Sequence, residues 1–305
     1  TRFRSGRDEY APPPSPDGNR FAFVSNRAGA TTLYVASIGG GTASSWRAVP
    51  IRSRRARAAT GRLRVTVLGP DGKPTAARIF LNASDGRSYA PDGGFHRVSA
   101  ATETHYFQAP RAFDVEVPAG RTSIEAMKGY EYRPRAATVD VPAGATRAVT
   151  LRLERLANLP ADGWYSGDTH VHDLHQGRFG LTHQTFFDQL LAEDLHVTNA
   201  LIHMDDSKIM GRWEDLTGKP SPLSTRDYVL QYGEEFRGSL GHIALLGIQH
   251  FVLPFQSGVP NSAYAQPEPD ASYLDSAKAQ GGMAGYVHPY LNAVREPVDG
   301  SNSLI

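Results

Sequence analysis

The sequence contains no cysteine. That absence excludes disulfide bonds, thiolate zinc sites and cysteine nucleophiles together. The sequence also lacks any apolar run of about 18 residues, the length expected of a transmembrane helix. Neither sign of charge is in excess, because 32 Lys and Arg residues nearly balance 31 Asp and Glu residues. A net charge of +1 favours neither nucleic acid nor an acidic membrane surface as a partner.

The chain begins with Thr1 rather than methionine, and its first residues do not have the pattern of a signal peptide. We therefore expect a processed protein or a part of a longer one. Composition otherwise fits a globular protein, with 40% hydrophobic and 21% charged residues in a length of 305. This length predicts two or three domains.

Residues 1–45 are the first expected domain. Phe21 and Phe23, and later Leu33 and Val35, alternate with polar residues and predict two strands joined across residues 26–30. The turn Ser15-Pro-Asp-Gly with this strand pair resembles one blade of a TolB-like β-propeller. Because a propeller needs about four blades or more, the resemblance implies that residues 1–45 are the last of several.

Residues 60–156 are expected to form a β-sandwich module. Short alternating segments are separated by Gly and Pro turns, and the sequence Val-Pro-Ala-Gly occurs at Val117 and again at Val141. This pattern is typical of sandwiches. The module resembles those that accompany secreted hydrolases, so its function is either sugar or surface binding or the spacing of neighbouring domains.

Residues 158–305 show strand and helix patterns in alternation. A helix is expected within Leu181–Leu195, a strand over Val197–Met204, a strand over Gly241–Gly247 and a helix over Tyr273–Gln280. Alternation of this kind predicts a parallel α/β sheet or barrel. The expected fold class is therefore a multidomain protein with a β-propeller blade fragment, a β-sandwich and a partial α/β barrel.

Nine of the 11 histidines lie at or beyond His170. His170 and His172 are two residues apart, so on a strand their side chains face the same side. Paired imidazoles suit a divalent metal ion. Further ligand-type side chains end the later strands, namely Glu235, His242 and His288. We therefore predict a metal site formed by these five residues.

The motifs Gly167-Asp-Thr-His-Val-His, Gly233-Glu-Glu-Phe and Val287-His-Pro resemble those of the polymerase-and-histidinol-phosphatase (PHP) superfamily, and most closely its CehA/McbA branch of metallohydrolases. The resemblance implies a partial PHP-like barrel that is incomplete at its C-terminal end. It implies a bridging carboxylate at Glu235, with Glu234 as the alternative. It also implies two or three divalent ions (Zn, Mn or Fe) when the site is complete.

On this resemblance, a metal-activated water would hydrolyse a phosphoester, ester or carbamate bond of a small-molecule substrate. The candidate catalytic residues are Asp168, His203 and Arg237. Asp168 would cap the turn or orient a ligand histidine, and Arg237 would contact an anion. His203, Asp205 or Asp206 would replace a family motif whose order is changed here, or His203 is a buried, hydrogen-bonded residue. For His175, His183, His196 and His250 the expectation is a surface or structural role. A periplasmic or extracellular location is expected.

Two alternatives accompany the hydrolase. The first is a non-catalytic binding or scaffold protein with an incomplete, relic metal site, which the absence of the family's last ligand motif favours. The second is a serine hydrolase that uses Ser166, which the absence of a Gly-x-Ser-x-Gly elbow argues against. Metal content and hydrolysis of model esters and phosphates discriminate the first alternative from the metallohydrolase.

Overall fold

The computed structural model describes residues 9–10, 14–28, 30–40, 43–50, 52, 56–99, 104–173, 181–205, 208–238, 241–253 and 269–287. The chain divides into two compact units. Unit 1 comprises residues 1–50, 167–182 and 197–305, and unit 2 comprises residues 51–166 and 183–196. The boundaries expected from the sequence, 1–45, 60–156 and 158–305, stay predictions.

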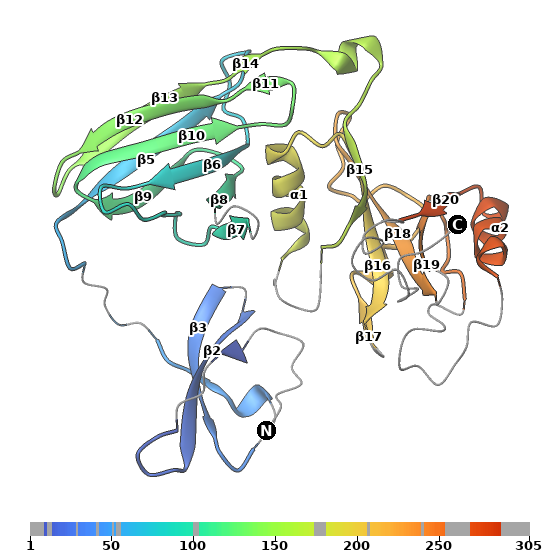
Figure 1. Cartoon of the computed structure of the whole chain (residues 1–305), viewed down its shortest axis with the longest axis horizontal. Coiled ribbons are helices and arrows are strands. Elements are labelled where there is room, and N and C mark those ends of the chain that lie inside the picture. Colours follow the sequence, from blue (N-terminus) through green and yellow to red (C-terminus); the bar gives the residue numbers. More distant parts are fainter. Residues whose placement is uncertain are drawn as a thin grey trace, which may run out of the picture. The chain divides into compact units, whose positions relative to one another are not determined.

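Unit 2 is a β-sandwich (Figure 1). One sheet has the order β13-β5-β9 and the other has the order β12-β10-β6-β8-β7. The strands are β5 (Thr60–Leu68), β6 (Ala77–Asn82), β7 (Arg97–Ser99), β8 (Thr104–Ala109), β9 (Phe113–Pro118), β10 (Gly120–Met127), β12 (Arg135–Val141) and β13 (Thr146–Arg152). A smaller pair joins β11 (Tyr132–Arg133) to β14 (Glu154–Arg155), and a 3-10 helix, η2, spans Leu159–Asp162.

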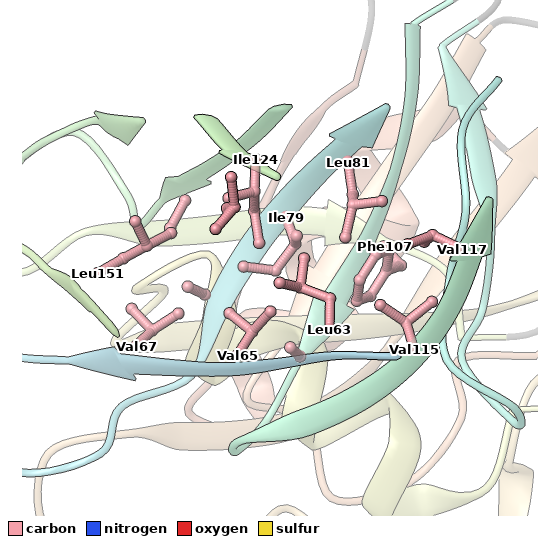
Figure 2. Close-up of a cluster of buried hydrophobic side chains, with 14 of the residues drawn as sticks. Leu63, Val65, Val67, Ile79, Leu81, Phe107, Val115, Val117, Ile124 and Leu151 are labelled. Atoms are coloured by element: carbon pink, nitrogen blue, oxygen red, sulfur yellow. The ribbon is translucent and has the colours of Figure 1, made fainter. Parts of the chain in front are cut away.

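The sandwich core follows from the alternation along each strand. In β5, Leu63 and Val65 are fully buried while Arg62 and Arg64 between and beside them are exposed. Side chains from both sheets meet in one cluster, as Figure 2 shows. Because successive residues of a strand point to opposite faces, one apolar residue in every two is enough to cover the inner face of each sheet.

Helix α1 (His183–Ala192) belongs to the sandwich unit, where it contacts β6 and β8. Arg78 and Glu193 form a bidentate ion pair there, with N–O distances of 2.9 and 2.7 Å. Lys128 donates a hydrogen bond to the carbonyl of Leu191, in the last turn of α1. Cations stabilise the carbonyl end of a helix, so these contacts attach the helix to the sandwich.

The N-terminal part of unit 1 is a four-stranded antiparallel sheet of order β1-β2-β3-β4. Its strands are β1 (Glu9–Tyr10), β2 (Arg20–Ala28), β3 (Ala30–Ser37) and β4 (Arg47–Ala48), with a 3-10 helix η1 at Ala43–Ser45. Phe21, Phe23 and Tyr34 are buried, and the edge of Trp46 packs on the Phe23 ring at a centroid distance of 4.9 Å. These aromatic contacts form a small core for this sheet.

The remaining part of unit 1 is a six-stranded mixed sheet of order β15-β16-β18-β19-β20, with β17 paired to β16 (Figure 1). Its strands are β15 (Gly167–Val171), β16 (Val197–Asp205), β17 (Lys208–Met210), β18 (Val229–Gly238), β19 (Gly241–Leu246) and β20 (Met283–Tyr286). A 3-10 helix, η3, spans Trp213–Asp215, and helix α2 spans Asp270–Ala279. The ring of Phe236 in β18 stacks on Tyr273 in α2, with 3.8 Å between centroids.

This sheet corrects the expected fold class. The pairings β15–β16 and β16–β18 are parallel, but β18–β19 and β19–β20 are antiparallel. Residues 181–195 do contain a helix, yet it packs on the sandwich instead of connecting β15 to β16 across their own sheet. Across the described residues the strands form an open mixed sheet, so the expectation of a partial PHP-like α/β barrel is wrong.

Candidate metal centre

One face of the mixed sheet gathers the predicted polar side chains. In the β18–β19 register, Arg237 lies opposite His242 and Glu235 lies opposite Ala244, which places Glu235, Arg237 and His242 on the same face. In the β16–β18 register, Ile202 is paired with Glu234, so the next residue along, His203, lies beside Glu235. The alternation of strands therefore brings these side chains together.

Glu235 is the centre of the cluster, and its side chain is only 1% exposed. Its Oε2 lies 3.0 Å from Nε2 of His172, and its Oε1 lies 3.6 Å from Nε2 of His170. His170, His172 and Glu235 each offer a ligand atom, and these three atoms all lie within 4.8 Å of one another. Among the described residues, no second group of three or more His, Asp or Glu side chains has this arrangement.

A backbone carbonyl orients the ring of His172. Nδ1 of His172 lies 2.8 Å from the carbonyl oxygen of Leu201, so a proton on Nδ1 donates there and Nε2 faces Glu235. Metal-binding histidines commonly have such a partner, because it fixes the tautomer and the ring direction. Asp168 accepts a hydrogen bond from the backbone N–H of His170 at 2.9 Å.

That hydrogen bond lies within an irregularity of β15. The register against β16 shifts between Asp168 and Val171, which is the signature of a β-bulge. A bulge re-aims the side chains that follow it. His170 and His172 thus reach the same carboxylate, with their ring centroids 5.2 Å apart.

His242 and Arg237 complete the surroundings of the carboxylate. Nδ1 of His242 lies 2.9 Å from Oε1 of Glu235, and an Nη of Arg237 donates to Oε2 at 3.1 Å. His170, His172, His242 and Arg237 keep between 12% and 25% of their side-chain surface exposed. These four side chains are therefore partly accessible to solvent, while the carboxylate itself is buried.

Two further predicted residues are placed clearly by the structure. His203 is fully buried, and its ring lies 4.3 Å from that of His172, centroid to centroid. Glu234 points to the opposite face, where it accepts a hydrogen bond from the N–H of Val252 at 2.8 Å. Burial raises the pKa of Glu234 to about 8. The structure thus turns Glu235, and not Glu234, toward the histidines.

Several predicted residues are not part of this geometry. His288, His175 and Asp206 lie outside the described residues, and the side chain of Asp205 does as well. His183 begins α1, and Nδ1 of His196 lies 2.8 Å from Oγ of Ser166, both within the sandwich unit. His250 is exposed.

Asp173 is a neighbouring residue that sequence reasoning missed. It is buried, and its carboxylate forms an ion pair with Arg212 at 3.0 Å and accepts a hydrogen bond from the hydroxyl of Tyr232. Burial, followed by the charge of Asp173, raises the pKa of Tyr232 well above its usual range. Asp173 directly follows His172, so this network anchors the chain where it leaves β15. The one feature of the sequence that could have pointed to Asp173 is its position directly after His172.

No protein-family model matches the chain. No curated protein matches it either. Solved structures that match include GBS52, the minor pilin of Streptococcus agalactiae, at 15% identity, covering 47% of this chain and 63% of that one, with a TM-score of 0.25.

Two other matches are also pilus proteins. The shaft pilin SpaA from Lactobacillus rhamnosus GG is 10% identical over 48% of this chain and 71% of its own, with a TM-score of 0.23. The group B streptococcus pilus 2b backbone protein is 12% identical over 50% of this chain and 55% of its own, with a TM-score of 0.25. TM-scores this low assign no function to the chain.

These findings overturn the family and enzyme expectations. No family model matches the chain, and across the described residues the sheet that carries the candidate site is open and mixed instead of a PHP-like barrel. The assignments to the PHP superfamily, the CehA/McbA branch and a TolB-like propeller are wrong, and so is the assignment as a hydrolase. The roles expected of Asp168, His203 and Arg237 stay predictions, and no comparison supports the expected small-molecule substrate. In the described part of the chain, no helix has the length and apolar character needed to cross a bilayer.

Proposed function

We propose that this protein is a non-catalytic binding protein and that its mixed sheet binds a divalent transition-metal ion through His170, His172 and Glu235. The observation that carries the proposal is the convergence of three ligand atoms, from β15, the residue after it and β18, within 4.8 Å of one another. His242 is the candidate for a fourth ligand because it already contacts the same carboxylate.

The chemistry of these donors selects the class of metal. Imidazole nitrogen suits zinc, copper, nickel and iron, whereas calcium and magnesium prefer sets of oxygen ligands. Two imidazoles and one carboxylate are a known zinc ligand set, which leaves a position open to an external donor. A zinc ion held here would add a second positive charge, beside that of Arg237, to the surroundings of the buried Glu235 carboxylate.

The ion has a structural consequence and a binding consequence. Structurally, it ties the edge strand β15 to the central strand β18, which are separated by β16. For binding, the exposed sides of His170 and His242 leave the ion accessible to a donor from a partner molecule. The proposed function is therefore recognition through a metal ion. A location outside the cytoplasm is part of this proposal, and a chain without cysteine tolerates an oxidising compartment.

Isothermal titration of the metal-free chain with zinc tests the proposal. We expect His172→Ala to weaken zinc binding by at least about tenfold. His170→Ala, at the more exposed of the two positions, should also weaken zinc binding by at least about tenfold. His250→Ala is the matched control, because His250 is an exposed histidine of the same unit. Equal zinc affinity in all four proteins, each with the circular dichroism spectrum of the native chain, would contradict the metal site.

A second measurement tests the non-catalytic part. The zinc-loaded chain is assayed with p-nitrophenyl esters and phosphates, and Glu235→Gln is assayed beside it. We expect both proteins to match the rate of free zinc at the same concentration. Turnover that the zinc-loaded chain shows and Glu235→Gln loses would overturn the binding function.

A further inference from the structure

We propose that His96 and His105, in the sandwich unit, form a second binding site for a late divalent transition metal such as Zn²⁺ or Cu²⁺. The site is independent of the one in the mixed sheet, since it shares no residue with it and lies in the other unit. Nothing in the proposed function requires it.

The strand register brings the two histidines together. His96 directly precedes β7, and His105 lies in β8, which pairs with β7 in antiparallel fashion. Val98 is opposite His105, so His96, two residues before Val98, shares its face of the ribbon. The two imidazoles are therefore diagonal neighbours on one face, close enough for long side chains to meet.

The separation of the rings suits one shared ion. Two imidazoles that bind a tetrahedral zinc ion with N–Zn bonds of about 2.0–2.1 Å have their ring centroids about 5 Å apart. The centroids of His96 and His105 are 5.1 Å apart, with 45° between the ring planes. The His170–His172 pair has nearly the same separation, 5.2 Å.

The surroundings supply a third polar group and an accessible opening. Nε2 of His96 lies 3.0 Å from Oγ of Ser88, which is held near the ribbon by the bridge between Ser88 and Asn82. Both histidines line an open hollow of about 610 Å³ on the sandwich. Water can enter this hollow. It can therefore supply the remaining ligands of an ion that is bound by only two imidazoles of the protein.

The residues that line the hollow decide which class of metal fits the site. Arg87 also lines the hollow, and the charge of Asp85 beside it partly offsets the guanidinium charge. With nitrogen donors and no carboxylate among the lining residues, the site selects zinc or copper over calcium and magnesium.

Copper titration followed by electron paramagnetic resonance tests the inference on the full chain. The His170→Ala/His172→Ala double variant serves as background, so that the site in the mixed sheet is removed. In this background we expect one bound Cu²⁺ whose pulsed spectrum shows two imidazole nitrogens. Adding His105→Ala should reduce the couplings to one imidazole and weaken copper binding by at least about tenfold.

His105→Asn is the second variant, because it keeps a polar side chain on an exposed strand position. His250→Ala in the same background is the control and should leave the spectrum and the affinity unchanged. Copper binding that is insensitive to both substitutions at His105, or a spectrum with a single imidazole in the background protein, would overturn the second site. The background protein lacks the histidines of the first site. The copper result therefore tests the second site alone, whether or not the proposed function is correct.

Discussion

Nε2 of His172 lies 3.0 Å from Oε2 of Glu235, although His172 directly follows β15 and Glu235 lies in β18, which is not the neighbour of β15 in the sheet. The contact depends on two features of β15 and β16. The β-bulge between Asp168 and Val171 re-aims the histidine, and the carbonyl of Leu201 fixes its ring. The candidate metal centre is therefore held by backbone geometry on one side and by a buried carboxylate on the other.

The two adjacent glutamates of β18 should respond differently to the same substitution. Glu235→Gln removes a charged ligand from the histidine cluster, so we expect zinc affinity to fall by at least about tenfold. Glu234→Gln changes a side chain on the opposite face, and zinc affinity should stay within about twofold of the native value. Isothermal titration at constant pH measures both. The reverse ranking would show that the strand presents the other glutamate to the metal.

Glu234 should make the stability of unit 1 depend on pH. Its pKa is raised from 4.5 to about 8 in the folded protein because the carboxyl is buried, so the folded state holds the proton more tightly than the unfolded state. This contribution is fully present below the unfolded pKa and is lost as pH rises through the window from 4.5 to about 8. The slope is at most about 1.4 kcal/mol per pH unit for one proton.

Glu234→Gln should remove this slope, because glutamine can still accept the hydrogen bond from Val252 but does not titrate. Urea unfolding of both proteins in the presence of a chelator, from pH 5 to pH 8 in steps of about one unit, measures the difference. Taking the difference between the two proteins cancels the titration of the nearby histidines. Parallel pH profiles would show that Glu234 is ionised in the folded chain throughout.

Gly233 should not tolerate a side chain, because the strands approach closely there. A Cβ atom at Gly233 would lie 2.6 Å from the carbonyl oxygen of Leu245 and 3.1 Å from Cδ2 of Leu201. We expect Gly233→Ala to separate β18 from β19, to cost about 1–3 kcal/mol of stability and to weaken zinc binding. Gly285→Ala is the matched control, since a Cβ there meets nothing within 4 Å. Equal melting temperatures of the two variants would contradict the close approach.

The buried ion pair of the sandwich unit should be costly to break. Nζ of Lys128 lies 3.5 Å from Oδ1 of Asp194, and the side chains are 5% and 4% exposed. Lys128→Met leaves the carboxylate of Asp194 buried without its cation, so we expect a loss of about 3 kcal/mol or more in urea unfolding. The double variant Lys128→Met/Asp194→Asn should recover part of that loss.

The exposed pair of Lys73 and Asp71 provides the control for this experiment. Its atoms are 4.0 Å apart, and its side chains are 81% and 61% exposed. Lys73→Met should therefore change stability by less than about 1 kcal/mol. If Lys128→Met lowered the free energy of unfolding by no more than Lys73→Met does, the ion pair of Lys128 and Asp194 would not hold the helix end to the sandwich.

Local patterns in the sequence determined where several strands lie. The alternation of Leu63, Val65 and Val67 predicts β5 and its buried face, and the apolar run over Val197–Met204 corresponds to β16. The spacing of His170 and His172 indicates a shared face. Such inferences succeed because a strand's side chains alternate regardless of which strands later become its neighbours.

Only the tertiary structure decided what these elements build. The sequence pattern around residues 181–195 predicts a helix but does not say that it packs on the sandwich, because an apolar stripe fits either sheet. Likewise, β19 pairs with β18 in antiparallel fashion, so the sheet is mixed rather than barrel-like. Glu235 rather than Glu234 meets the histidines because register, a long-range property of paired backbones, assigns each side chain to a face.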